Sequence, residues 1–293
     1  IMILWLASYP KSGNTWVRTI LAQIIYNNFD SEKAIETSKK IRLYPSKKDF
    51  LELDEDFKLS TYPPNKKKLI LDKTISNWEI SQDLINLNNK INIFKTHNML
   101  CKIPFKDQEY AFTNIDNTIG VIHVVRDPRN VITSLINHFS FESEEHAINF
   151  IINENQTIGL EDNTIPQILS SWGHHYNSWK RFPKNNFLIK YENLIKNPRF
   201  EIDRLIEYLK KFFNIKISEK DINKIILNSS FENLKSLETQ GLFDENAVSK
   251  KTSEVKNFFN LGKENKWQNL VQTKTSNQIE KFFQNEMKDL GYI

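Results

Sequence analysis

Two short segments of the chain combine basic and hydroxyl side chains in a way that suits the binding of an anion. In the first, Tyr9 to Trp16, an apolar run ends, a turn follows and a helical pattern begins. Backbone N–H groups at the start of a helix point toward an anion, and the helix dipole favours negative charge there. Lys11 adds a full positive charge, and Gly13 permits close approach of the backbone. The other polar donors of the segment are Ser12, Asn14 and Thr15.

The second segment, Val124 to Ser134, places Arg126 at the end of another apolar run. Asp127 and Pro128 then supply an N-cap and a first-turn proline to the helical pattern that follows. A guanidinium can hold a phosphate through two parallel hydrogen bonds, and Ser134 lies within the following helix. An arginine at a strand end can equally form a structural ion pair. Beside a first anion site, a ligand with two separated phosphates is favoured.

His97 is the candidate general base, because it directly follows the apolar run Ile91–Thr96 and its imidazole accepts a proton near neutral pH. His123 lies inside a predicted strand and is expected to be structural. No His, Cys, Asp or Glu spacing resembles a zinc or iron site, so no metal is expected. The other histidines, also expected to be structural or at the surface, are His138, His146, His174 and His175.

These segments need a scaffold that brings strand ends together. Short apolar runs rich in β-branched and aromatic residues predict buried strands at Met2–Ala7, Ile91–Thr96, Thr118–Val125 and Phe187–Tyr191, with Leu69–Leu71 as a candidate fifth. Helical patterns lie at Thr15–Tyr26, Arg129–Phe139, Pro166–Arg181, Pro198–Phe213 and Thr275–Leu290. Strands that alternate with helices predict an α/β class, a three-layer α/β/α fold with a central parallel sheet. Open sheets of this kind bind ligands at the carboxyl ends of their strands.

The composition bounds the class of protein. The 293 residues are 39% hydrophobic and 26% charged, which fits a globular protein and excludes disordered and collagen-like classes. We expect one domain over residues 1–293. The net charge of +4 is too small to indicate nucleic-acid binding, and the single Cys101 excludes an intrachain disulfide. No apolar run is long enough for a membrane span and no export signal is evident, so a cytoplasmic location is expected.

Three blocks of this sequence together resemble the sulfotransferase family, which moves a sulfuryl group from 3′-phosphoadenosine 5′-phosphosulfate (PAPS) to a hydroxyl or amine. They are Tyr9-Pro10-Lys11-Ser12-Gly13-Asn14-Thr15-Trp16, Phe94-Lys95-Thr96-His97 and Arg126-Asp127-Pro128-Arg129-Asn130-Val131 with Ser134. Two weaker similarities follow, at Lys190-Tyr191-Glu192-Asn193-Leu194 and Ser229-Ser230-Phe231. The resemblance therefore spans nearly the whole chain. It implies a P-loop NTPase-like sulfotransferase fold, PAPS as co-substrate without a metal, and a small-molecule or saccharide acceptor.

The resemblance also implies a role for each matching residue. Lys11 to Thr15 would hold the 5′-phosphosulfate, with Lys11 also serving the leaving group. Arg126 and Ser134 would bind the 3′-phosphate. His97 would be the general base and Lys95 a supporting charge. The remaining implied nucleotide contacts are Trp16 and Phe231 at the adenine, Ser229 as a polar partner, Tyr191 and Gly262.

The chain departs from the family pattern near its C-terminus. The family often has an arginine there that grips the 3′-phosphate, whereas this chain has Asn260 in Asn260-Leu261-Gly262. Lys263 or Lys266 could substitute for that charge. The surrounding stretch, Thr239–Lys266, is the least regular part of the chain and is expected to be a lid over the ligand.

Two other functions remain open from the sequence. A P-loop kinase acting on a small molecule needs two glycines in the pattern G-x-x-x-x-G-K-[ST], but the first segment has only Gly13, and Lys11 precedes it. The kinase also needs an acidic magnesium anchor, whereas the run Thr118–Val125 is followed by Arg126. The second alternative is a non-catalytic nucleotide-binding protein on the same scaffold, which the loss of the C-terminal arginine suggests. The acceptor and the oligomeric state cannot be read from the sequence.

Overall fold

The structure is a computed structural model that describes residues 2–58, 62–87, 90–105, 108–160, 164–243, 247–248 and 255–293. Within it the chain divides into two compact units. Unit 1 consists of Ile1–Tyr9, Arg42–His123 and Ile151–Phe187. Unit 2 consists of Pro10–Ile41, Val124–Phe150 and Leu188–Ile293.

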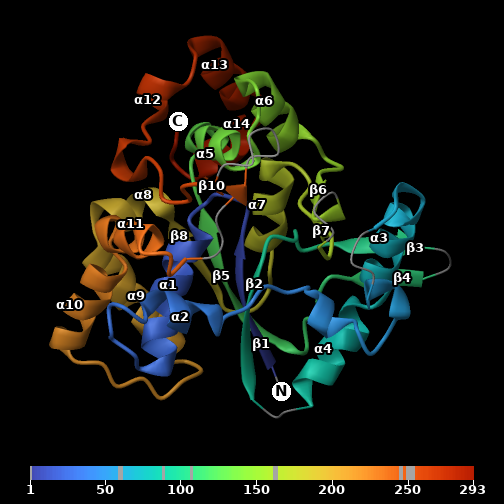
Figure 1. Cartoon of the computed structure of the whole chain (residues 1–293), viewed down its shortest axis with the longest axis horizontal. Helices are drawn as coiled ribbons and strands as arrows, with labels where there is room; N and C mark the ends of the chain where they lie inside the picture. The colour runs from blue at the N-terminus through green and yellow to red at the C-terminus, as the bar shows by residue number, and fades with distance from the viewer. Residues whose placement is uncertain are drawn as a thin grey trace. The chain divides into compact units, whose positions relative to one another are not determined.

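A four-stranded parallel sheet with the order β2-β1-β5-β8 is the centre of the fold (Figure 1). Its strands are β1 (Met2–Ser8), β2 (Ile91–Thr96), β5 (Thr118–Val125) and β8 (Asn186–Lys190). Each lies within one residue of the bounds predicted from its apolar run. All residues of β5 are buried, as expected for a strand that is covered on both faces. The predicted α/β class with a central parallel sheet is therefore confirmed.

In unit 1, β1 pairs with β2 in a parallel register that sets Ala7 opposite Thr96, so the two strands end side by side. The core around them is aromatic. The indole of Trp5 packs against Phe112, with ring centroids 5.1 Å apart, and its Nε1 donates to Thr113 Oγ1 at 3.2 Å. The other elements of unit 1 are the 3₁₀ turns η1 (Lys47–Asp49), η2 (Glu55–Lys58) and η3 (Pro64–Lys66), then α3 (Lys67–Ser76), α4 (Trp78–Asn86), β3 (Lys102–Phe105), β4 (Gln108–Ala111), β6 (Thr157–Ile158), β7 (Gln167–Ile168) and α7 (Trp172–Lys180).

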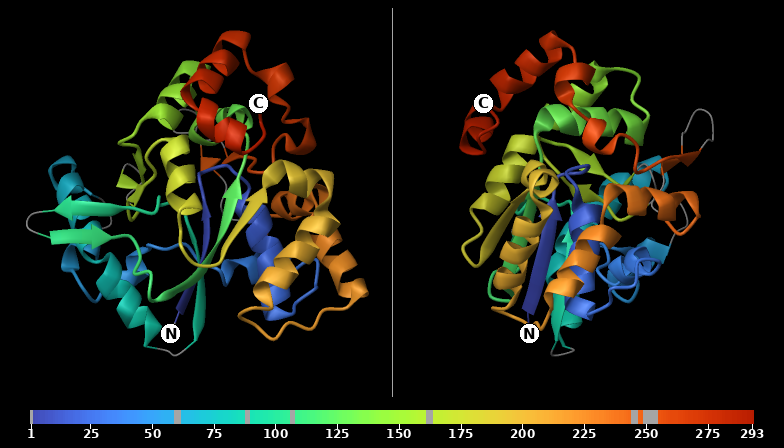
Figure 2. Two further views of the ribbon diagram at one scale, coloured as in Figure 1. Left: turned by 180° about the vertical axis from the view of Figure 1, so that it is seen from behind. Right: turned by 90° about the vertical axis from the view of Figure 1, so that its left-hand side faces the viewer.

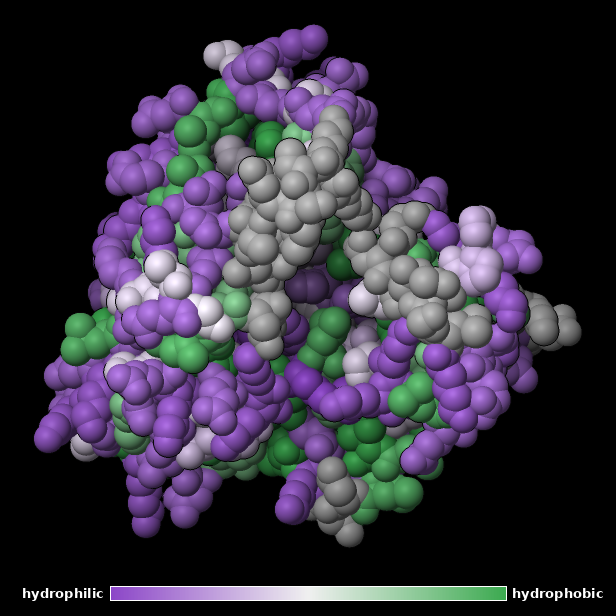
Figure 3. All heavy atoms as spheres, in the orientation of Figure 1, coloured by the Kyte–Doolittle hydropathy of each residue, from purple (hydrophilic) through white to green (hydrophobic). Residues whose placement is uncertain are grey.

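Unit 2 is mainly helical. In it α12 and α13 pack against α5 (Figure 2), and the surface over α10 and α11 is mostly hydrophilic (Figure 3). The start of α5 is as predicted, because the side chain of Asp127 accepts a hydrogen bond from the N–H of Arg129. The elements are α1 (Asn14–Tyr26), α2 (Ala34–Lys39), α5 (Pro128–Phe139), α6 (Glu144–Ile152), α8 (Tyr191–Lys196), α9 (Pro198–Leu209), α10 (Glu219–Asn228), α11 (Phe231–Thr239), β9 (Ala247–Val248), β10 (Val255–Lys256), η5 (Gly262–Glu264), α12 (Trp267–Leu270), α13 (Thr273–Phe282) and α14 (Gln284–Asp289).

Three sequence predictions need correction. Leu69–Leu71 is not a strand but part of α3, where Ile70 is buried and Leu69 is exposed, as one face of a helix requires. The helix predicted from Pro166 begins only at Trp172, where Ser171 caps it, and the residues before it form β7. The helix predicted over 275–290 is divided into α13 and α14.

The predicted lid, Thr239–Lys266, lies partly outside the described residues. Among the described residues, no helix combines the length and the apolar character that crossing a membrane requires.

Candidate active site

The turn that follows β1 has the backbone of an anion site. In unit 2, Lys11 and Gly13 both adopt left-handed conformations, with φ of 65° and 99°. Gly13 is the N-cap of α1 and has no side chain that could cap the first N–H groups of the helix, which leaves room for an anion to do so. The hydroxyl of Ser12 is fully buried and has no hydrogen-bond partner among the described residues. A buried donor of this kind needs an acceptor, which an anion would supply.

Arg126 lies directly against this turn. Its Nη1 donates to the main-chain oxygen of Lys11 at 3.1 Å and to Ser134 Oγ at 3.2 Å. Arg126 is 6% exposed, and its Nε has no hydrogen-bond partner among the described residues. Among the described residues no carboxylate forms an ion pair with it, so the structural ion pair that the sequence left open is not formed. The two predicted anion segments are therefore adjacent, and the nearly buried guanidinium between them forms no direct ion pair among the described residues, although Glu192 interacts with it electrostatically.

Tyr191, the first residue of α8, joins the two segments. Its ring lies 4.1 Å from the guanidinium carbon of Arg126 and meets Trp16 edge-on, with centroids 5.4 Å apart. A Cβ atom added to Gly13 would stand 2.5 Å from the same ring. The structure thus brings together five residues that sequence analysis named as candidate nucleotide contacts: Lys11, Gly13, Trp16, Arg126 and Tyr191.

A second aromatic contact covers Lys11. Its Nζ lies 3.6 Å from the centroid of the Phe258 ring. The carboxylate of Glu238, which is 7% exposed, accepts the backbone N–H groups of Phe258 at 2.5 Å and Phe259 at 3.1 Å. Glu238 therefore fixes the backbone that presents this ring.

The residues expected near the adenine also lie in unit 2. Phe231 and Trp16 are partly buried against one apolar cluster. Gly262, at φ +53°, touches Phe231, because an added Cβ would lie 2.8 Å from that ring. The hydroxyl of Ser229 donates to Ile225 O at 2.6 Å, which leaves it only an acceptor function. Of the residues that follow the missing arginine, Lys263 and Lys266 are exposed, as is Asn260 itself, whereas Asn265 is buried.

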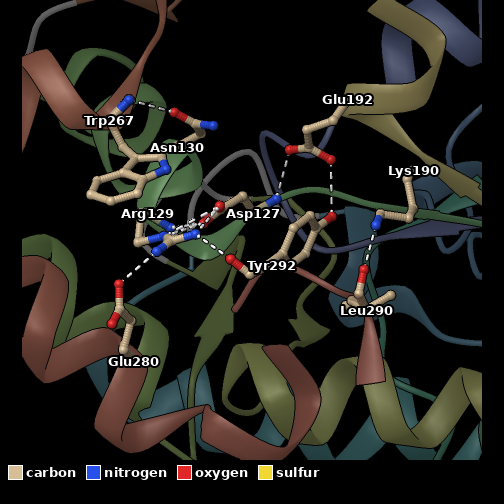
Figure 4. Close-up of polar contacts among 9 residues, drawn as sticks. All are labelled: Asp127, Arg129, Asn130, Lys190, Glu192, Trp267, Glu280, Leu290 and Tyr292. Atoms are coloured by element: carbon tan, nitrogen blue, oxygen red, sulfur yellow. Dashed lines mark hydrogen bonds and ion pairs between the residues drawn. The ribbon is translucent and has the colours of Figure 1, made fainter. Parts of the chain in front are cut away.

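The other arginine of the second segment, Arg129, is structural (Figure 4). It pairs with Asp127 at 2.6 Å and with Glu280 at 2.5 Å, and its Nη2 also donates to the main-chain oxygen of Tyr292 at 3.0 Å. Its guanidinium carbon lies 3.9 Å from the ring centroid of Trp267. Two carboxylates thus pair directly with Arg129, whereas Arg126 has no direct ion pair among the described residues.

Glu192 braces the ends of β5 and β8 (Figure 4). Its Oε1 accepts the N–H of Asp127, and its Oε2 accepts the hydroxyl of Tyr292, both at 2.9 Å. Burial raises the pKa of Glu192, although these hydrogen bonds oppose the shift. Asp127 and Glu192 directly follow Arg126 and Tyr191 in the chain, so this brace orients both.

His97 lies in unit 1, just beyond the end of β2. Its Nδ1 is 2.8 Å from the main-chain oxygen of Ser8 and 3.3 Å from Ser8 Oγ. A carbonyl oxygen only accepts, so in the neutral ring Nδ1 carries the proton and Nε2 keeps a lone pair. The backbone N–H of His97 donates to Gln167 Oε1 at 2.9 Å. The backbone and the ring of His97 are thus both held by hydrogen bonds, and the ring is in the tautomer that can accept a proton at Nε2.

The surroundings of His97 within unit 1 are rich in buried rings. Burial lowers the pKa of His175 well below its ordinary value, and the nearby His123 and His97 contribute in the same direction. Tyr9 meets His175 edge-on, with centroids 5.5 Å apart. Lys95, two positions before His97, pairs with Leu6 of β1 and is partly buried.

Several residues of these arrangements were not identified from the sequence. Glu192 directly follows Tyr191 in the sequence, so its place beside a candidate nucleotide contact could have identified it. Asn265, Glu238 and Tyr292 belong to no motif, and no sequence signal pointed to them.

Among the described residues, no three His, Cys, Asp or Glu side chains gather closely enough to hold a metal ion.

Comparisons with known proteins agree on one family. A family model described as "Sulfotransferase domain" matches residues 3–291. The chain is 28% identical over 233 residues to mouse Sulfotransferase 1 family member D1, covering 78% of this chain and 65% of that protein. It is 22% identical over 294 residues to Cytosolic sulfotransferase 6 of Arabidopsis thaliana, covering 97% of this chain and 78% of that one. The match therefore spans just under two thirds of the mouse relative.

A solved structure shows the same fold. The crystal structure of retinol dehydratase in complex with androsterone and the inactive cofactor PAP aligns with a TM-score of 0.58 and 19% sequence identity. The alignment covers 98% of this chain and 81% of that one.

Proposed function

Because this chain belongs to the sulfotransferase family, we propose that it transfers a sulfuryl group from PAPS to a hydroxyl or amine of a small-molecule or saccharide acceptor. The family match covers both compact units, so residues 1–293 would act as one functional domain. The product nucleotide is 3′-phosphoadenosine 5′-phosphate (PAP).

One observation carries this proposal. Arg126 is nearly buried beside the turn of Lys11, yet its hydrogen-bond partners among the described residues are all neutral groups. Leaving a nearly buried charge without a direct ion pair is unfavourable, and a bound phosphate would reduce that penalty. The hydroxyl of Ser12, which has no partner among the described residues, adds a second unsatisfied donor to the same unit.

The donor roles follow residue by residue. Lys11 and the turn through Thr15 hold the 5′-phosphosulfate, and Arg126 with Ser134 holds the 3′-phosphate. The aromatic residues that contact the nucleotide are Trp16, Tyr191 and Phe231. Gly262 contributes through its contact with Phe231 rather than through a polar group.

The reaction requires one proton transfer and one charge stabilisation. The acceptor oxygen or nitrogen forms a bond to sulfur while the bond from sulfur to the bridging phosphate oxygen breaks, and that oxygen keeps the electron pair. Lys11 and the backbone N–H groups of the turn stabilise the developing charge. His97 Nε2 takes the proton of the acceptor, since its Nδ1 is committed to Ser8. Lys95 contributes a nearby positive charge.

A binding comparison followed by a turnover assay tests the proposal. The protein would be titrated with PAP and with ATP, each with and without magnesium, and then incubated with PAPS and phenol, alcohol, amine and saccharide acceptors. We expect metal-independent binding of PAP and a sulfated product from at least one acceptor class. Tighter, magnesium-dependent binding of ATP would favour the kinase. PAP binding without any turnover would favour a non-catalytic binding protein.

A further inference from the structure

Asn265 holds an unusual place for an amide, because it is 9% exposed and all of its polar atoms are engaged. Its Nδ2 lies 3.3 Å from the main-chain oxygen of Asn130 and 3.0 Å from Ser134 Oγ. Its Oδ1 accepts from the hydroxyl of Thr133 at 2.6 Å. The carbonyl of Asn130 can only accept, so the NH₂ group must face it. This contact fixes the orientation of the amide, and Asn265 donates to Ser134.

Ser134 therefore receives two hydrogen bonds at one oxygen. The second comes from Arg126 Nη1 at 3.2 Å, and a guanidinium only donates. A hydroxyl has two lone pairs and one hydrogen, so both lone pairs are occupied. The hydrogen of Ser134 has no acceptor among the described residues.

A serine within a helix often gives its hydrogen to the carbonyl four residues before it. For Ser134 that carbonyl belongs to Asn130, which instead accepts from Asn265, and no hydrogen bond from the Ser134 hydroxyl to it is formed among the described residues. Ser134 is half-buried at this point. Its O–H is thus left to donate away from the protein.

We infer that Asn265 is a positioning residue for the 3′-phosphate: it makes Ser134 an obligate hydrogen-bond donor beside Arg126. The inference rests on the proposed function. Arg126 Nη1 is occupied, but Nε and Nη2 form a second edge that can grip a phosphate. Ser134 would add a third donor to the same oxygen group. Asn260 lacks the charge of the family arginine, so hydrogen bonds carry more of the selectivity in this chain.

Selectivity between two adenine nucleotides tests the inference. The Kd values of PAP and of adenosine 5′-phosphate, which lacks the 3′-phosphate, would be measured by calorimetry. We expect Asn265→Ala to weaken PAP by about 10-fold and to leave adenosine 5′-phosphate within about 2-fold. Asn265→Asp should weaken PAP by about 100-fold, since a carboxylate both accepts the Ser134 hydrogen and repels the phosphate.

A double-mutant cycle separates positioning from a general structural role. In a Ser134→Ala background, Asn265→Ala should cost less than about 2-fold in PAP affinity, because the hydroxyl it orients is gone. Asn269→Ala, an exposed residue of α12, is the matched control and should match the wild type. Thermal unfolding checks that each variant is folded. If Asn265→Ala does not fold, the Ser134→Ala and Asn265→Asp variants test the inference in its place.

Two results would overturn the inference. One is an equal loss of both nucleotides in Asn265→Ala, and the other is an undiminished loss of PAP in the Ser134→Ala background. A wild-type protein that binds PAP no more tightly than adenosine 5′-phosphate would instead refute the proposed function. The wild-type measurement therefore distinguishes the two failures.

Discussion

Gly13 packs against the ring of Tyr191 so closely that a Cβ atom at position 13 would stand 2.5 Å from Cδ2 of the tyrosine. The same ring lies 4.1 Å from the guanidinium carbon of Arg126. The turn after β1, the end of β5 and the start of α8 therefore depend on one another through a single tyrosine.

Gly13→Ala should damage this arrangement in two ways. The new methyl group meets an aromatic ring, and φ of 99° is strained for any residue with a side chain. We expect a stability loss of about 2–4 kcal/mol and a PAP affinity at least about 10-fold lower. Gly241→Ala is the matched control, because Gly241 has φ of 75° but nothing within 4 Å of an added Cβ. If both variants bind PAP alike, the contact with Tyr191 does not matter for the donor.

The two arginines of the second segment should respond differently to removal. Arg126→Ala should weaken PAP by about 2–4 kcal/mol, since it removes a charged partner of the phosphate. Arg129→Ala should mainly reduce stability, by about 3–5 kcal/mol, because it leaves Asp127 buried without its cation. Calorimetric titration with PAP and urea unfolding on both variants check this. Unchanged PAP affinity in Arg126→Ala would contradict the 3′-phosphate assignment.

His97→Ala should separate binding from turnover. The imidazole that takes the acceptor proton is lost, so we expect turnover to fall by about 10²-fold or more while PAP binding persists. The measurement is the rate of sulfated product formation at saturating PAPS. His174→Ala, which changes an exposed histidine of α7, should retain the wild-type rate. A near-normal rate in His97→Ala would remove this residue from the mechanism.

The buried His123 should make stability depend on pH. Burial lowers the pKa of His123 to about 3, from 6.5 in an unperturbed histidine. The unfolded chain then binds one more proton than the folded chain between these values. The contribution of this residue to stability is complete above about pH 6.5 and is lost as the pH falls toward 3.

This effect can be isolated by substitution. His123→Phe keeps a ring against Tyr176, whose centroid lies 5.8 Å away, but cannot titrate. Between about pH 4 and 6, the slope of unfolding free energy against pH should decrease by about 1.4 kcal/mol per unit. Urea unfolding at several pH values measures that slope. His146→Phe alters an exposed histidine and should leave the slope as it is; an equal change in both variants would argue against burial as the cause.

The parts of the fold that sequence analysis predicts well are those with strong local signals. A strand covered on both faces must be a continuous apolar run, and β5 is fully buried along its length. Asp127 indicates the start of α5, because an N-cap interacts only with the next few residues of the chain. Leu69–Leu71 shows the weakness of such a local signal, since three apolar residues fit a strand or a helix face equally well.

The same division between local and long-range signals applies to the contacts of the candidate site. Lys11 and Arg126 sit where strands end, and parallel strands bring their ends to one edge. Their direct hydrogen bond spans 115 positions, and the sequence predicts the neighbourhood but not the contact. The links from Asn265 to Ser134 and from Tyr292 to Glu192 span 131 and 100 positions. Only packing of the C-terminal segments creates them, so no local pattern could reveal them.

The neutral contacts of Arg126 have a practical consequence for the choice of buffer. A guanidinium held by a carbonyl, a hydroxyl and a tyrosine ring attracts small oxyanions, because no carboxylate of the described residues is paired directly with it. Inorganic sulfate and phosphate in a buffer would therefore compete with the nucleotide. The nucleotide would therefore appear to bind more weakly in such buffers than in chloride alone. This difference in affinity should be smaller in Arg126→Ala.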